Sequence, residues 1–193
     1  MPSISDAEIQ EIVQRVLNRN KRPENSQPVS APAANETGQG DRKVAIANDH
    51  GGVALKNTLK AYLVELGYRV VDFGTSDTKS VDYPDYAYMV AEMVSEGKAW
   101  RGIVIDGAGI GSCMAANKVP GVRCAMCYDY ATAVNSREHN NANVLSLGAG
   151  LLGPALAKQI VKTWLETEFG GGRHDRRVDK IMAIEKKFMK SGD

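Results

Sequence analysis

The sequence is short of several features, and each shortage excludes a class of protein. It has no apolar run of about 18 residues, which argues against a membrane-spanning helix. Lys and Arg number 24 against 23 Asp and Glu, so the net charge of +1 lacks the basic surplus typical of nucleic-acid binding. Only three cysteines occur, and the start, MPSISDAEIQ, has neither the basic nor the apolar region of a secretory signal. We therefore expect a protein of the reducing cytoplasm.

The first 42 residues differ in composition from the rest. Residues 21–42, KRPENSQPVSAPAANETGQGDR, have three prolines and almost no apolar side chains, which predicts a flexible linker. Residues 1–20 precede it, and their apolar side chains recur with the period of a short amphipathic helix. These side chains are Ile9, Ile12, Val13, Val16 and Leu17. A lone helix of about 14 residues is marginally stable in water, so it needs a surface on which to dock.

Two docking surfaces are open for this helix. One is the chain's own domain, or a second copy of it in an oligomer. The other follows from a resemblance: a short amphipathic helix, a Pro/Ala/Ser linker and then a domain resemble the encapsulation peptides of bacterial microcompartment cargo. That resemblance implies shell proteins as partners and the compartment lumen as the location, and we favour it.

Residues 43–193 alternate short β-rich runs with segments of helical period. Strands are predicted over residues 43–49, 68–74, 101–107, 122–128 and 143–148. Helices are predicted over residues 51–67, 84–97, 109–119, 129–140, 153–168 and 175–190. Five strands alternating with helices predict an α/β, Rossmann-like three-layer αβα domain with a five-stranded parallel sheet.

Ligands of such sheets bind outside the carboxyl ends of the strands. Asp49 and His50 follow the first predicted strand, and Asp106 begins the run DGAGIG after the third. All three histidines of the chain, including His139 and His174, fall in loops, so we expect them to share one pocket. Glycine-rich turns at a helix start present backbone N–H groups to an anion or an oxyanion.

Two other pairs have clear interpretations. Arg173 and Arg177 are one helical turn apart, so both guanidinium groups can converge on a phosphate or carboxylate. Cys124 and Cys127 form a C-x-x-C, but in a strand they point to opposite faces, and no second pair accompanies them. We assign these two cysteines to the core rather than to a metal site.

Five motifs in order resemble the ribose-5-phosphate isomerase B family, which includes the galactose-6-phosphate isomerase subunits. They are AxxxDHGGxxLK, DYPDYA, GxGIGxxxAANKVPGVR, REHNxANVLxLG and GGRHxxRVxKI, and they span about residues 43–187. The resemblance implies a homodimer or homotetramer that needs no metal or other cofactor. It also implies aldose–ketose isomerisation of a sugar phosphate through an enediolate, with ribose 5-phosphate as the default substrate.

The resemblance also implies roles for individual residues. His139 would assist ring opening, and the two arginines would hold the phosphate across a subunit interface. The implied substrate-binding residues are Asp49, His50, Tyr83, Gly107, Gly109, Gly111, Asn140, Arg173 and Arg177.

Four positions depart from the family pattern. Asp106 stands where many members have a cysteine base, and Ser112 where others have a glutamate base. Ala108 replaces a common threonine or serine, and Gly150 replaces an arginine. An ordinary aspartate is ionised at pH 7, so we interpret Asp106 as the base that removes the C2 proton. The alternative for Asp106 is a helix cap in a protein without isomerase activity.

Three other functions stay open at this point. The substrate could be another sugar phosphate or a sugar acid, because the departures lie in the expected pocket. The chain could be a catalytically inactive cargo protein. A dinucleotide-binding module is disfavoured, because its third glycine comes one residue early and the loop follows the third strand rather than the first.

Overall fold

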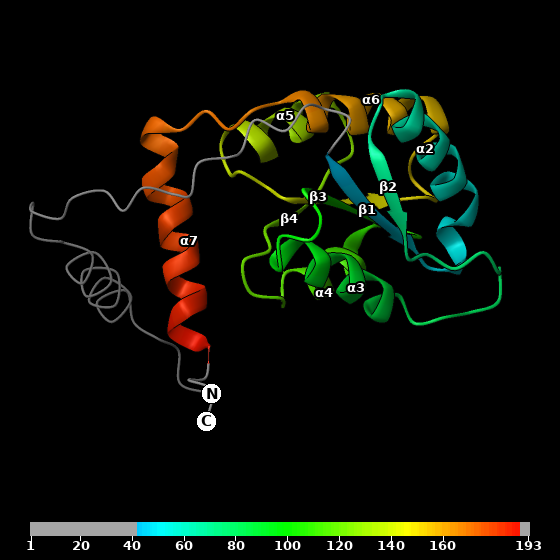
Figure 1. Cartoon of the computed structure of the whole chain (residues 1–193), viewed down its shortest axis with the longest axis horizontal. Coiled ribbons are helices and arrows are strands. Elements are labelled where there is room, and N and C mark those ends of the chain that lie inside the picture. The colour runs from blue at the N-terminus through cyan, green and yellow to red at the C-terminus, as the bar shows by residue number, and fades with distance from the viewer. Residues whose placement is uncertain (1–41, 190–193) are drawn as a thin grey trace, which may run out of the picture. The chain divides into compact units, whose positions relative to one another are not determined.

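The computed structural model describes residues 42–189 (Figure 1). The predicted amphipathic helix and nearly all of the linker lie outside the described residues. The strands in chain order are β1 (Lys43–Asn48), β2 (Arg69–Asp72), β3 (Arg101–Asp106), β4 (Cys124–Met126) and β5 (Val144–Gly148). They form one parallel sheet in the order β2-β1-β3-β5-β4, so the five-stranded sheet predicted from the alternating pattern is confirmed.

Helices connect the strands and cover both faces of the sheet. The α-helices are α2 (Val53–Glu65), α3 (Tyr83–Ser95), α4 (Ile110–Ala116), α5 (Tyr130–Glu138), α6 (Pro154–Glu166) and α7 (Asp175–Phe188). Two short 3-10 turns, η2 (His50–Gly52) and η3 (Gly172–His174), precede α2 and α7. Figure 1 shows α2, α5 and α6 on one face and α3 and α4 on the other.

Each face of the sheet has its own apolar core because successive strand side chains alternate in direction. Val44 and Ile46 of β1 belong to the core that α2 and α6 close, whereas Ala45 of the same strand belongs to the core under α3. Buried residues fill every described position of β3, as expected for a parallel strand covered on both sides. Cys127 and Cys124 lie in different cores, which agrees with their assignment to core positions.

The boundaries of the elements differ from the predicted ones by a few residues. The fourth strand shortens to three residues because only Cys124–Met126 pair with β5 at the free edge of the sheet. Gly67 adopts a φ of 85°, the left-handed conformation that ends α2 where the glycine predicted it. Among residues 42–189, no helix is long and apolar enough to cross a membrane.

Candidate active site

The carboxyl ends of β1, β3 and β5 meet at one edge of the sheet. Asn48 pairs with Ile105, and Asp106 pairs with Gly148, so the loops that follow these strands start side by side. The N–H of Asp49 donates to the carbonyl of Ile105 at 3.0 Å, which fixes the β1 loop against β3. The structure therefore brings together the predicted residues Asp49, His50, Asp106 and the glycine loop.

Asp49 holds the turn that presents His50. Its Oδ1 accepts the N–H groups of Gly51 at 2.9 Å and Gly52 at 3.2 Å, and the residue is buried. The Nδ1 atom of His50 accepts the N–H of Val81 at 3.2 Å, so its proton is assigned to Nε2. The imidazole is partly exposed, and its Nε2–H has no acceptor among the described residues, so it can donate to a ligand at this edge.

Asp106 is the last residue of β3, and its carboxylate is engaged by backbone. Its Oδ1 accepts the N–H groups of Ala108, at 2.9 Å, and of Gly109, and its Oδ2 accepts the N–H of Ser112 at 2.8 Å. The residue is only 5% exposed. Asp106 therefore caps the entry to α4, the alternative role that the sequence left open, and its role as the base stays a prediction.

The glycine loop after β3 is fixed from several sides. Gly109 has a φ of 80°, which favours glycine, and its carbonyl accepts the Ser146 hydroxyl of β5 at 2.6 Å. Gly150 donates to the carbonyl of Gly107 at 2.9 Å. Within residues 42–189, the N–H groups of Gly107, Ile110 and Gly111 donate to no backbone or side-chain acceptor. They are the loop's available donors for an oxyanion.

Tyr83 lies against this loop from the start of α3. A Cβ on Gly111 would come within 2.5 Å of the Tyr83 ring, so the glycine permits the contact. The ring is 40% exposed, and it forms one wall beside the glycine loop.

His139 and Asn140 lie at the opposite edge of the sheet. Helix α5 runs back from the carboxyl end of β4, and residues 139–143 then lead into the amino end of β5. Because β5 has five residues, the two edges are about 16 Å apart. The expectation that the three histidines share a pocket is therefore wrong within a single chain, because the helix direction separates His139 from His50.

The segment after α6 joins His139 at this second edge. Gly170 donates to the carbonyl of Glu138 at 2.9 Å, and the ring of His174 stacks on that of His139 with centroids 4.2 Å apart and planes 7° apart. Arg173 donates from Nε to Nε2 of His174 at 3.3 Å. Arg173 and Arg177 are exposed here, so the second group comprises His139, Asn140, His174 and the two arginines.

Arg137 fastens the turn that carries His139. Its guanidinium donates to the carbonyls of Ala142, at 2.5 Å, and Thr167, at 3.2 Å, and to Oδ1 of Asn141 at 2.9 Å. Burial lowers the pKa of Arg137 to about 10, with Glu168 opposing the shift. The residue thus links the end of α5 to the end of α6.

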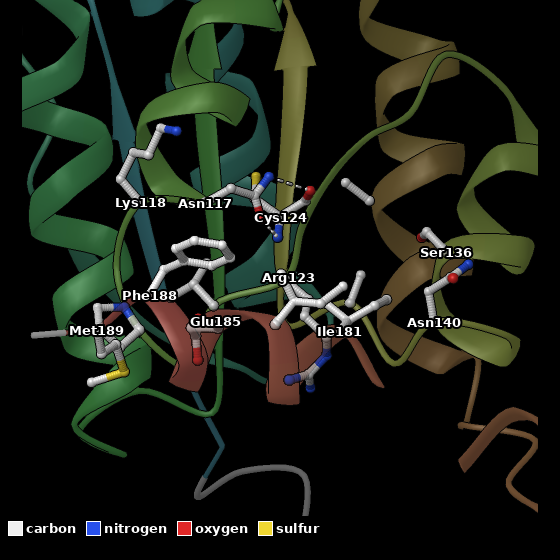
Figure 2. Close-up of a pocket in the computed structure, with 15 residues that line it drawn as sticks. Asn117, Lys118, Arg123, Cys124, Ser136, Asn140, Ile181, Glu185, Phe188 and Met189 are labelled. Atoms are coloured by element: carbon white, nitrogen blue, oxygen red, sulfur yellow. Dashed lines mark hydrogen bonds between the residues drawn. The ribbon is translucent and has the colours of Figure 1, made fainter. Parts of the chain in front are cut away.

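An apolar groove lies between α7 and β4, the outermost strand of the sheet. It encloses about 740 Å³. Figure 2 shows Phe188 and Ile181 of α7 pointing toward the segment that carries Cys124. Phe188 is 76% exposed and Ile184 61%, an unusual state for such side chains in a stripe along one helix. Asn140 lines the same groove, so the groove adjoins the second group of residues.

A comparison with family models assigns the domain. Residues 44–181 match the model described as Ribose/Galactose Isomerase. The chain belongs to this family. The match includes the glycine loop after β3, so the dinucleotide-binding interpretation is not supported. Residues 1–43 lie outside the match.

Curated relatives of the family cover the domain almost end to end. The putative sugar phosphate isomerase YwlF of Bacillus subtilis is 51% identical over 146 residues, which are 75% of this chain and 98% of the relative. Ribose-5-phosphate isomerase B of Escherichia coli is 44% identical over 76% of this chain and 98% of its own length. D-erythrulose-4-phosphate isomerase of Pectobacterium atrosepticum is 45% identical over 72% and 91%.

Solved structures of the family have the same fold. Ribose-5-phosphate isomerase B of Clostridium thermocellum superimposes with a TM-score of 0.75 at 53% identity, over 76% of this chain and 99% of that one. The type B enzyme of Trypanosoma cruzi gives a TM-score of 0.75 at 44% identity, over 77% and 99%. The Rossmann-like three-layer architecture is therefore that of the family.

Sequence reasoning missed the placement of His174. The histidine is visible beside Arg173 in GGRH, but its stacking on His139 joins residues 35 positions apart in the chain, and no local pattern signals that contact. It likewise missed Arg137, which reads in the sequence as an ordinary helix-end cation.

Proposed function

We propose that this sugar phosphate isomerase converts ribose 5-phosphate into ribulose 5-phosphate through an enediolate. The observation that carries the proposal is the loop after β3, in which the Asp106 carboxylate and three N–H groups without an acceptor among residues 42–189 lie within six residues of the chain. An aldose–ketose isomerase needs a base for the C2 proton and donors for the developing oxyanion. Both are present within a loop of six residues.

Asp106 is proposed as the base through Oδ2. The Oδ1 atom is anchored by two N–H groups, whereas Oδ2 accepts only that of Ser112. A carboxylate oxygen has two lone pairs, so Oδ2 keeps one for a proton. The anchoring of Oδ1 holds Oδ2 in a fixed direction, which favours reaction by avoiding reorganisation.

The glycine loop is proposed to stabilise the enediolate. The N–H groups of Gly107, Ile110 and Gly111 would donate to the sugar oxygens at C1 and C2 as negative charge develops. His50 and Tyr83 border the same space. They would hold the hydroxyl groups of the open sugar, His50 through its Nε2–H.

The remaining residues are proposed to come from a second copy of the chain. His139 and Asn140 lie at the other edge of the sheet with Arg173 and Arg177, so one chain alone holds half of the expected site. In a homodimer the two halves meet, and the exposed apolar side chains of α7 become buried. His139 would then open the sugar ring, and the arginines would bind the phosphate.

The substrate is tested with a panel of aldose phosphates. Ketose formation from ribose 5-phosphate is expected to exceed that from erythrose 4-phosphate and from a hexose 6-phosphate in kcat/KM by about tenfold or more, since each lost or added pocket contact is worth about 1–3 kcal/mol. A relative in the family carries the name D-erythrulose-4-phosphate isomerase, so the tetrose is the informative rival. A preference for it, or for a sugar acid, would overturn the choice of ribose 5-phosphate. No turnover of any sugar would favour an inactive cargo protein.

We also propose that residues 1–20 direct the enzyme into a bacterial microcompartment. Support comes from the sequence, in which residues predicted to form an amphipathic helix and a linker precede a domain that corresponds to 91–99% of the length of the relatives compared. The domain makes up nearly all of each of those relatives, which supports a separate purpose for the additional segment.

Deletion of residues 1–42 tests the targeting proposal. The shortened enzyme is expected to keep kcat and KM within about twofold, because the deleted residues lie outside the domain, and to lose co-purification with shell proteins. The full-length chain with Ile12→Asp and Val16→Asp tests the same proposal without a deletion. It should also lose co-purification with shell proteins. Loss of the oligomer on sizing, with the shell association intact, would instead assign the helix to the oligomer.

A further inference from the structure

His174 forms an unusual contact beneath His139. The two imidazole rings are stacked, with their centroids 4.2 Å apart and their planes 7° from parallel. His174 is only 7% exposed, whereas His139 lies at the accessible end of α5. Gly171 and Gly172, both with a φ of 57°, form the turn that directs the chain into this position. The buried ring is thus a platform for the more accessible one.

The hydrogen bonding of the His174 ring nitrogens is unfavourable for a residue that only fills space. Its Nε2 faces the Nε–H of Arg173 and must therefore carry a lone pair, which leaves the proton on Nδ1. The Nδ1 atom is buried without a hydrogen-bond partner in the described part of the chain. A phenyl ring would fill the same slot without this loss of solvation.

His139 is fixed from a second direction by its own helix. The side-chain amide of Asn135, one turn earlier, lies with Nδ2 at 2.8 Å from Nδ1 of His139. With the amide as donor, Nδ1 is the acceptor and Nε2 carries the proton. The stack sets the plane of the ring, and the amide sets its tautomer, so that Nε2–H is presented outward.

Burial and charged neighbours both lower the pKa of the His174 imidazole, which favours its neutral form. Desolvation lowers the pKa of the His174 imidazole most, and His139, Arg173 and Arg177 lower it further. Glu138 acts in the opposite direction. A proton on Nε2 of His174 would also meet the N–H of Arg173.

We propose that His174 is a positioning residue for His139, holding its ring for the ring-opening proton transfer, and that its Nε2 also orients Arg173 toward the substrate phosphate. The proposal rests on the proposed function for the reaction that His139 serves. It assigns two separable roles to one side chain: the stacked ring acts on ring opening, and Nε2 acts on phosphate binding.

Two reactions of the same enzyme separate ring opening from the chemistry at carbon. Ribose 5-phosphate is a closed ring that must open before C2 can react. Ribulose 5-phosphate carries its phosphate on the oxygen that would close a five-membered ring, so it stays open. Exchange of its C1 hydrogen with D2O therefore reports proton abstraction without ring opening.

The experiment compares His174→Ala with His174→Phe in the full-length enzyme. Alanine removes the stack, and we expect the kcat for ribose 5-phosphate to fall about tenfold or more. The rate of deuterium exchange at saturating ribulose 5-phosphate should stay within about twofold. Phenylalanine restores the stack, and we expect turnover to return to within about threefold of the natural enzyme. Because Phe offers Arg173 no acceptor, the KM for both sugar phosphates should remain raised about threefold to tenfold.

Nuclear magnetic resonance of the imidazoles gives a readout that does not depend on turnover. The chain has three histidines, so the ring protons of His139 are readily assigned. Their ring-current shift should vanish in His174→Ala and reappear in His174→Phe. Parallel losses of turnover, exchange and Tm in both variants would reduce His174 to a structural role and overturn the proposal. An unaltered ring-opening rate in His174→Ala would overturn it equally. If the natural enzyme acts on neither sugar but the ring-current shifts of His139 change as expected, the proposed function is wrong, while the positioning of His139 by His174 is supported.

Discussion

Replacing Asp106 with asparagine is expected to lower kcat by about 10²–10⁴-fold, the usual contribution of a general base. The amide keeps one oxygen for the N–H groups of Ala108 and Gly109, so the entry to α4 is still capped on that side. It cannot accept a proton at the position of Oδ2. Substrate binding, measured by the Kd of ribose 5-phosphate, should change by less than about fivefold.

Asp106→Cys is the matched control for this variant. A thiolate at the same strand end is the base that the family resemblance implies for many members, so the variant should recover much of the activity lost in Asp106→Asn. Its activity should rise with pH toward the range where a free thiol ionises, near a pKa of about 8.5. An asparagine variant as active as the natural enzyme would reduce Asp106 to its capping role and leave the base to another group.

Mixing two inactive variants is expected to restore activity, which is the second large effect. Asp106→Asn damages the half-site at the carboxyl edge of the sheet, and Arg173→Ala with Arg177→Ala damages the half-site at the amino edge. If each site combines the two edges from different copies, a hybrid dimer has one intact site and one doubly damaged site. Random exchange at equal concentrations then gives about a quarter of the natural activity, because half of the dimers are hybrids with one working site of two.

The controls for the mixing experiment use the same proteins. Each variant incubated alone must stay inactive, and the mixture must gain activity at the rate at which labelled subunits exchange. Exchange without any gain in activity would contradict a site shared between copies. Recovery would also locate the apolar groove beside α7 near the contact between copies, since Asn140 lines that groove.

The fold was predictable because the strands are buried on both faces. Runs such as KVAIAN and RGIVID have continuous apolar centres, VAIA and IVI, and helical periods separate them, which leaves few arrangements other than a parallel sheet. The three-residue β4 was predicted too long, because the extent of an edge strand depends on how far its neighbour pairs with it rather than on its own residues.

The carboxyl-edge half of the candidate site was predictable for the same reason. Asp49 and His50 follow β1, Asp106 ends β3, and parallel strands end at one edge. The hydrogen bonds of Asp106 could not be predicted from the sequence, since a carboxylate before a glycine loop is compatible with a base and with a helix cap. The separation of His139 from His50 depends on the direction of α5, and a residue that precedes a strand lies at the edge opposite to one that follows it.

The buried guanidinium of Arg137 has a consequence for kinetic measurements in acid. With a pKa near 10, it remains protonated throughout the acidic and neutral range, so the frame it builds between residues 137–142 and 167 does not titrate there. A decline of rate on acidification would therefore not come from loss of charge on this scaffold.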